Sequence, residues 1–199
     1  VLDTDNTSYA FAVLGSGQLE HLYYGRKLHA NEAVMTEKHT FIPGNTNVYN
    51  KDYSSYSLED VCLEMSSLGK GDIREPFIEV TYPNGSSTTD MVFDRAEIIQ
   101  GKEEYDALPG SYDDNGEVEQ LVIYLKDRNY NLTLELHYYV YEKCDIITRS
   151  AKLVNSGNES VRLERLMSMQ LDLNESDYEL SFFNGAWARE MNRSRIPIR

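Results

Sequence analysis

The residues from Gln120 to Leu173, QLVIYLKDRNYNLTLELHYYVYEKCDIITRSAKLVNSGNESVRLERLMSMQLDL, decide the fold of this chain. Apolar and polar side chains alternate in four segments, which short runs of turn-forming residues separate. Because successive side chains of a strand leave opposite faces, each segment predicts a strand with one face in a core. Short connections join antiparallel neighbours, so we predict a four-stranded antiparallel meander. Its strands are 121–126, 132–141, 146–154 and 161–173.

Alternation elsewhere predicts further strands. Residues 8–14 and 19–24 flank Gly15-Ser16-Gly17-Gln18, a turn sequence that predicts a β-hairpin. About ten strands predict an all-β, antiparallel sandwich of two sheets in a single domain, 1–199. The other predicted strands are 53–67, 77–82, 91–99 and 178–190, with an Asn84-Gly85 turn between the second and third. The last carries aromatic residues on both faces, which predicts cover on both sides.

Residues 25–52 follow no strand pattern. They contain Pro43, Gly44 and several asparagines, and few apolar residues recur at a regular spacing. Loops longer than about 12–15 residues in a compact domain are usually functional or disordered. We expect this excursion to be functional.

Charge and composition exclude several classes of protein. The chain has 19 Lys and Arg against 33 Asp and Glu, a net charge of −14, which opposes binding to nucleic acid or to anionic membranes. It contains no apolar run near the roughly 20 residues that cross a bilayer and no signal-peptide pattern at its start, so we expect a cytoplasmic protein without a membrane partner. Cys62 and Cys144 are too few for a disulfide framework, and we expect both to be reduced.

No catalytic residue, metal site or cofactor site is predicted from the residues themselves. With 33 carboxylates, a catalytic Asp/Glu pair cannot be picked out by abundance. The four histidines show no HxH or HExxH spacing, and His137 on a polar strand face is most often hydrogen-bonded or at the surface. The sequence also lacks GxSxG, P-loop and GxGxxG motifs.

Two stretches carry candidate site residues. In SSLGKGDIREP, residues 66–76, a glycine-rich loop presents Asp72, Arg74 and Glu75 before a strand. They predict a local ion pair, a contact with another domain or a contact with a ligand. In FFNGAWARE, residues 182–190, the only tryptophan, Trp187, lies close to Arg189. Such a pair is typical of interface anchors and sugar platforms, although a core tryptophan beside an exposed arginine is the simpler interpretation.

These two stretches, with YYGRK at 23–27 and YSLE at 56–59, resemble the N-terminal part of bacterial α-galactosidases of glycoside hydrolase family 36. The resemblance covers nearly the whole chain, in the same order. It implies an antiparallel two-sheet β-supersandwich that precedes a (β/α)8 catalytic barrel. It also implies enzymes that release terminal α-galactose, with retention, from melibiose, raffinose and related oligosaccharides.

Catalysis in that family implies a division between domains. Retaining enzymes use two carboxylates about 5–5.5 Å apart. In the family both belong to the barrel, the nucleophile in a Lys-Trp-Asp-x-Asn type motif that this chain does not contain. The resemblance therefore implies that the chain is the N-terminal, non-catalytic fragment of a longer chain.

The resemblance also implies partners. Packing against the barrel, or lining the rim of the sugar site, is the role it suggests for Asp72, Arg74, Trp187 and Arg189. Tetrameric members are thought to extend an N-terminal-domain loop into a neighbouring subunit's active site, and the matching region here is about 33–50. It thus implies a homotetrameric parent enzyme that acts on α-galactosides without a cofactor.

Two other functions remain open. A free-standing carbohydrate-binding module would use tyrosine-rich faces and Trp187 as stacking platforms. A mutarotase-like enzyme would instead use its own histidine and glutamate in a groove of a sheet.

Overall fold

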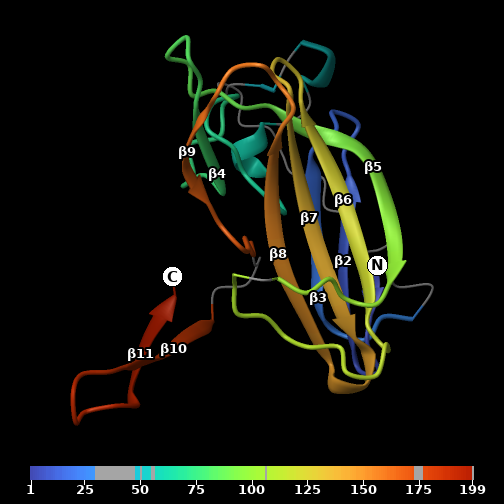
Figure 1. Ribbon diagram of the computed structural model, residues 1–199, viewed down its shortest axis with the longest axis vertical. Coiled ribbons are helices and arrows are strands. Elements are labelled where there is room, and N and C mark those ends of the chain that lie inside the picture. Colours follow the sequence, from blue (N-terminus) through green and yellow to red (C-terminus); the bar gives the residue numbers. More distant parts are fainter. Residues whose placement is uncertain (30–47, 50, 55–56, 106, 173–176, 199) are drawn as a thin grey trace.

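The computed structural model describes residues 1–29, 48–49, 51–54, 57–105, 107–172 and 177–198. Within these residues the fold consists of antiparallel β-sheets and 3-10 turns, and contains no α-helix (Figure 1). The prediction of an all-β, antiparallel fold is confirmed. No helix in the described part of the chain has the length and apolar character needed to span a membrane.

The N-terminal sheet has the order β1-β2-β3. Its strands are β1 Leu2–Asp3, β2 Thr7–Val13 and β3 Leu19–Arg26. The predicted hairpin between β2 and β3 is confirmed, since the Leu14 amide donates to the Gln18 carbonyl at 2.8 Å. Gly17 turns the chain at φ +98°, and an added Cβ there would lie 2.9 Å from the Val92 side chain. Glycine is therefore required at this turn.

The largest sheet has the order β5-β6-β7-β8, with every pair antiparallel. Its strands are β5 Met91–Gln100, β6 Glu119–Asp127, β7 Leu132–Tyr141 and β8 Ile146–Asn155, and η4 Glu142–Cys144 connects the last two. The first three strands of the predicted meander are therefore confirmed as β6, β7 and β8. β5 lies beside β6 after a long connection, 101–118.

The fourth strand of the predicted meander is wrong. β9 Arg162–Leu166 leaves the large sheet and pairs with β4 Ile78–Thr81 in a sheet of its own. Beyond β9 apolar and polar residues still alternate in the sequence, but the side chains of Gln170 and Asp172 accept hydrogen bonds from backbone amides of a distant segment. Alternation indicates an extended segment, and it does not identify the partner. The turn at Gly85 (φ +81°) is present as predicted, although β4 and β5 on either side of it belong to different sheets.

The strand predicted at 53–67 is also wrong. The described part of this segment forms 3-10 turns, η2 Lys51–Tyr53 and η3 Leu58–Asp60, followed by isolated bridges. Its apolar residues Leu58, Val61, Leu63 and Met65 are buried, as the pattern indicates. The carbonyls of Leu58 and Val61 accept hydrogen bonds from an arginine side chain, which takes the place of a neighbouring strand.

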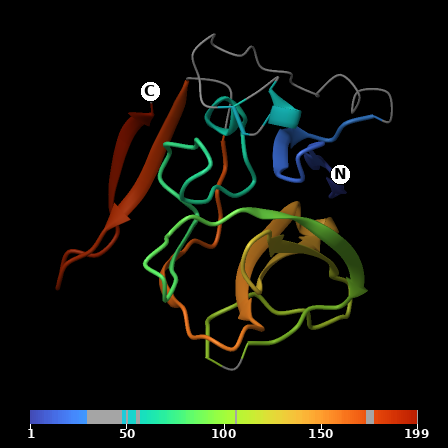
Figure 2. The same cartoon turned by 90° about the horizontal axis from the view of Figure 1, so that it is seen from above.

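The main core lies between the N-terminal sheet and the large sheet (Figure 2). On the inward face of β7, Leu134, Leu136 and Tyr138 are at most 2% exposed. They belong to one cluster with Tyr9 of β2 and Leu19 of β3. The core face predicted for β7 is confirmed. Most of the excursion at 25–52 lies outside the described residues, including nearly all of 33–50.

The last two strands, β10 Tyr178–Asn184 and β11 Asn192–Ile198, form a separate antiparallel hairpin. In Figure 1 this β10–β11 hairpin projects from the body of the domain near the C-terminal end of the described chain. The cover predicted on both sides of 178–190 is wrong for the described residues, because every residue of β10 is exposed. The aromatic residues of this strand therefore face outwards.

Candidate functional site

Arg74 is the centre of a polar network that follows the glycine-rich loop. Its Nε and Nη2 donate to the two carboxylate oxygens of Asp72, each at 3.0 Å, which is the bidentate geometry of a strong pair. Its Nη1 donates to Asp172 Oδ2 at 2.6 Å. The local ion pair expected from the sequence is present, and it gains a second carboxylate about 100 residues further along the chain.

The rest of the guanidinium group binds backbone. Nη1 also donates to the Val61 carbonyl at 2.8 Å, and Nη2 to the Leu58 carbonyl at 2.9 Å. All five N–H groups of Arg74 are thus engaged. Burial lowers the pKa of Arg74, but the hydrogen bonds and charge of Asp72, with the charge of Asp172, outweigh burial and raise the pKa. Arg74 therefore stays charged and connects the 58–61 turn to the 167–172 segment.

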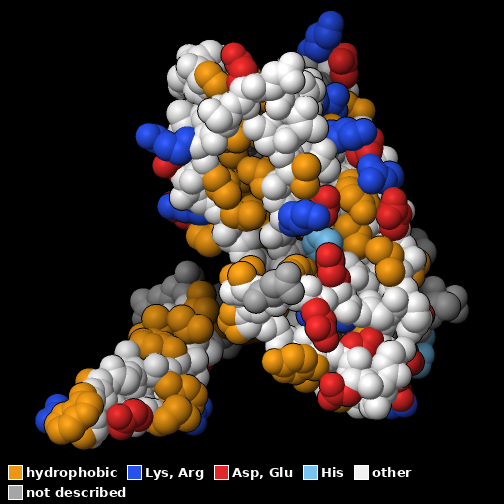
Figure 3. Space-filling view, viewed as in Figure 1, with side chains coloured by type: hydrophobic (Ala, Val, Ile, Leu, Met, Phe, Trp, Pro, Cys, Tyr) orange, Lys and Arg blue, Asp and Glu red, His pale blue; other side chains and the backbone are white. Residues whose placement is uncertain are grey.

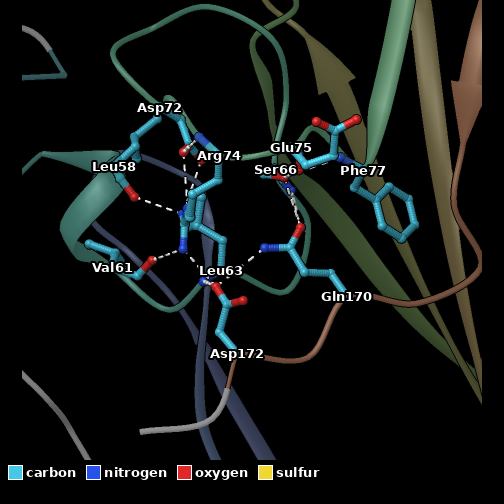
Figure 4. A network of polar contacts seen from close by, with 10 residues as sticks. All are labelled: Leu58, Val61, Leu63, Ser66, Asp72, Arg74, Glu75, Phe77, Gln170 and Asp172. Atoms are coloured by element: carbon cyan, nitrogen blue, oxygen red, sulfur yellow. Dashed lines mark hydrogen bonds and ion pairs between the residues drawn. The ribbon is translucent and has the colours of Figure 1, made fainter. Parts of the chain in front are cut away.

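Gln170 makes the second connection between the 167–172 segment and the rest of the fold (Figure 4). The amide and the hydroxyl of Ser66 both donate to Gln170 Oε1, at 2.9 and 2.8 Å. The Met167 amide donates to the Phe77 carbonyl at 2.9 Å. Residues 167–172 are thus tied to the body of the domain at Met167, Gln170 and Asp172, and we call these contacts the Arg74 network.

Substituting Arg74 by alanine is expected to lower the free energy of unfolding by about 1–3 kcal/mol. The change leaves the Asp72 carboxylate, whose side chain is 1% exposed, without its partner. Urea denaturation of Arg74→Ala and Arg74→Lys measures this loss. Lysine keeps the positive charge but cannot form the bidentate hydrogen bonds of a guanidinium group. Arg74→Lys should therefore recover only part of the stability. Equal stability of all three proteins would show that the network does not hold the fold.

The β10–β11 hairpin has one apolar face. The register places Leu180 opposite Ile196 and Tyr178 opposite Ile198 on it. The other face carries an ion pair between Glu179 and Arg195, 3.2 Å apart. The exposed apolar residues of the hairpin are Tyr178, Leu180, Phe182, Phe183, Trp187, Met191, Ile196 and Ile198. They gather along the projecting hairpin in the space-filling view (Figure 3).

Trp187 lies in the turn of the hairpin and is 95% exposed. The amide of Arg189 donates to the Ala186 carbonyl at 2.8 Å, which closes the turn around Trp187 and Ala188. The simpler interpretation, a core tryptophan, is wrong. The sequence-predicted residues therefore form two separate groups, Asp72 with Arg74 in the network and Trp187 with Arg189 in the hairpin turn.

A second polar cluster lies in the core, around Glu64. This carboxylate is 0% exposed. It accepts from Tyr9 at 2.5 Å and from Tyr138 at 2.7 Å, and Arg149 lies 3.1 Å away. His21 Nδ1 lies 2.9 Å from the same carboxylate. Because both His21 and Glu64 are buried, the pair cannot meet a solvent-borne substrate, and we assign it a structural role.

The Glu64 cluster predicts that the chain loses stability in acid. Burial raises the pKa of Glu64, but the hydrogen bonds from His21, Tyr9 and Tyr138 and the charge of Arg149 outweigh burial and hold it below its ordinary value of 4.5. A carboxyl whose pKa is lower in the folded state stabilises the fold above the unfolded pKa, and this stabilisation is lost as pH falls below about 4.5. Urea denaturation at several pH values should show a steeper acid loss in the native chain than in Glu64→Gln. Parallel pH curves would contradict this.

The comparisons with known proteins bear on the whole chain. The family model described as the glycosyl hydrolase family 36 N-terminal domain matches residues 17–199. The chain belongs to this family. The resemblance seen in the sequence is thereby confirmed.

Relatives of this family 36 N-terminal domain are α-galactosidases. The α-galactosidase AgaA of Geobacillus stearothermophilus is 34% identical over 203 residues, which cover 99% of this chain and 27% of AgaA. The crystal structure of AgaA matches with a TM-score of 0.92 at 31% identity, covering 100% of this chain and 28% of that one. The α-galactosidase from Lactobacillus brevis matches with a TM-score of 0.91 at 35% identity. The family 36 domain thus spans little more than a quarter of these relatives.

Sequence reasoning on this family 36 domain missed three residues of the site. Asp172 and Gln170 do alternate with apolar neighbours on the polar side of 161–173, which was the available signal. Glu64 gave no such signal, since nothing in its neighbourhood distinguishes it from the other carboxylates.

Proposed function

We propose that this chain is the N-terminal, non-catalytic domain of an α-galactosidase, and that the β10–β11 hairpin docks it onto a catalytic (β/α)8 barrel. The observation that carries the proposal is the apolar face of that hairpin. A two-stranded hairpin alone is marginally stable in water, and an apolar surface of more than a few hundred Å² marks an interaction site. The apolar residues on this face are each between 37% and 48% exposed, and they are Tyr178, Leu180, Phe182, Ile196 and Ile198.

The relatives support the same division of labour. They carry the name α-galactosidase and are nearly four times as long as the part this chain matches. This chain lacks the Lys-Trp-Asp-x-Asn motif of the family's nucleophile. In the proposal, the longer parent removes terminal α-galactose from melibiose- and raffinose-type sugars, and this domain, arranged as a β-supersandwich, orients the barrel.

The Arg74 network supports the proposal mechanically. It fixes residues 167–172, which lead into the hairpin, to the body of the domain. Contacts that fix residues close to a docking element before it binds lower the entropy lost on docking. We therefore assign Asp72 and Arg74 to positioning, and Trp187 and Arg189 to contact with the barrel or the rim of its sugar site.

The proposal also covers the oligomeric state and the cellular location of the parent enzyme. We propose a tetrameric parent enzyme in the cytoplasm. Sedimentation of the parent enzyme would test the tetramer.

Activity assays on the separated parts test the proposal. The 199-residue chain should release no galactose from a chromogenic α-galactoside, whereas the parent enzyme should. A parent lacking residues 178–198 should lose activity or become less stable to heat. Galactose release by the isolated chain would overturn the proposal.

The carbohydrate-binding module remains a second candidate, because Trp187 is almost fully exposed. As the only tryptophan it reports its own surroundings by fluorescence. Saturable quenching of the isolated chain by galactose or raffinose would favour the module. Docking predicts no saturable change.

A further inference from the structure

The large sheet has a second face that the core does not use. In Figure 2 the sheet curls, and the connection between β5 and β6 crosses the open side of the curl. A groove of about 500 Å³ lies there, within the range of about 300–1,000 Å³ typical of small-molecule sites. In Figure 3 basic and acidic side chains lie close together on the face formed by β6, β7 and β8.

His137 of β7 and Gln120 of β6 are buried polar groups of this groove, at 4% and 3% exposure. Gln120 Nε2 donates to His137 Nδ1 at 2.7 Å. The ring proton therefore lies on Nε2, which donates to Glu135 Oε2 at 3.3 Å. Burial lowers the pKa of His137, and the hydrogen bond to Glu135 and the charge of that carboxylate offset only part of this effect. Near neutral pH the groove thus holds a neutral imidazole of fixed tautomer beside a carboxylate.

Charges of both signs line the groove. Lys152 Nζ of β8 lies 3.4 Å from Glu135 Oε2, and the Lys152 side chain is 58% exposed. Lys102 and Glu103 add a second pair of opposite charges at the rim. An anionic ligand meets the two carboxylates, and a cationic ligand meets the two ammonium groups. A neutral ligand rich in hydroxyls can donate to the carboxylates and accept from the lysines at the same time.

The floor of the groove also has an apolar part. Val122 and Tyr124 of β6 lie on the same strand face as Gln120. The guanidinium of Arg95 lies 3.7 Å from the centroid of the Tyr124 ring and holds it in place. An aromatic ring beside hydrogen-bonding groups of both kinds is a surface suited to a sugar, which has an apolar C–H face and a rim of hydroxyls.

We propose that this groove is a binding site for a neutral saccharide of mono- to trisaccharide size. Glu135 accepts from sugar hydroxyls, Lys152 donates to them, and Tyr124 contacts the C–H face. The site belongs to this chain alone and does not depend on docking to a barrel. Its failure would leave the proposed function untouched.

Titration of the ¹⁵N-labelled 199-residue chain with galactose, glucose and raffinose, followed by NMR, tests the site. At least one of these sugars should give saturable shifts confined to the groove residues of β6, β7 and β8. Glu135→Gln and Lys152→Ala should each raise its dissociation constant at least tenfold. Lys126→Ala is the matched control. Lys126 lies on the same face of β6 as the groove residues but outside the groove, where it pairs with Asp94 of β5.

Three results would overturn the proposal. In the first, none of the three sugars saturates. In the second, the shifts cluster at Trp187 and the hairpin, which would favour the module. In the third, both groove variants, folded as judged by their spectra, bind as tightly as Lys126→Ala.

Discussion

Replacing Glu64 by alanine is expected to lower the free energy of unfolding by about 3–5 kcal/mol, because removing one partner of a buried ion pair leaves the other charge without compensation. The Arg149 side chain is 6% exposed, and its Nη2 lies 3.1 Å from Glu64 Oε2. Tyr9 and Tyr138 would also lose the acceptor for their hydroxyls. Urea denaturation followed by circular dichroism measures the change.

Glu164→Ala is the control for the Glu64 variant. Glu164 pairs with Arg162 at the surface, where ion pairs contribute little. We expect no measurable change in the unfolding midpoint. A Glu64→Ala chain as stable as Glu164→Ala would contradict the assignment of Glu64 to the core.

Replacing Trp187 by serine is expected to weaken the association of this chain with the catalytic barrel at least 30-fold, or about 2 kcal/mol. Buried aromatic anchors dominate interfaces, and Trp187 is the most exposed large apolar residue of the described chain. Because its side chain is 95% exposed, the stability of the isolated chain should not change. Calorimetric titration of the chain with the separately produced barrel measures the loss.

Tyr112→Ser is the control for the tryptophan variant. Tyr112 is an aromatic residue of the β5–β6 connection that is 75% exposed, and it lies outside the hairpin. It should bind the barrel as the native chain does. If both variants bind equally well, the hairpin turn is not the anchor.

Local pattern was enough to find most strands. The alternation in 132–141 predicted β7 and its core face. When the side chains alternate with a period of two and one set is apolar, only that set can face the core. Which strands pair with each other was harder to predict from the sequence. The pattern of 161–173 could not reveal that β9 pairs with β4, since the partner lies some 80 residues earlier in the sequence.

The site shows the same limit. Asp72 and Arg74 are two residues apart, so their pairing could be predicted from the sequence, whereas Asp172 joins them only through the fold. For Trp187 the prediction depended on what covers it. An exposed hairpin with an apolar face has the same composition as a core strand, and only the structure separates the two.

The most direct test of the docking proposal uses Trp187 as its own probe. The chain is labelled with 5-fluorotryptophan, which gives a single ¹⁹F signal because it has one tryptophan. The isolated chain should show the chemical shift and solvent sensitivity of a hydrated indole. Addition of the unlabelled catalytic barrel should move the signal and remove its sensitivity to solvent. A stable complex in which this signal stays unchanged would contradict docking through the hairpin.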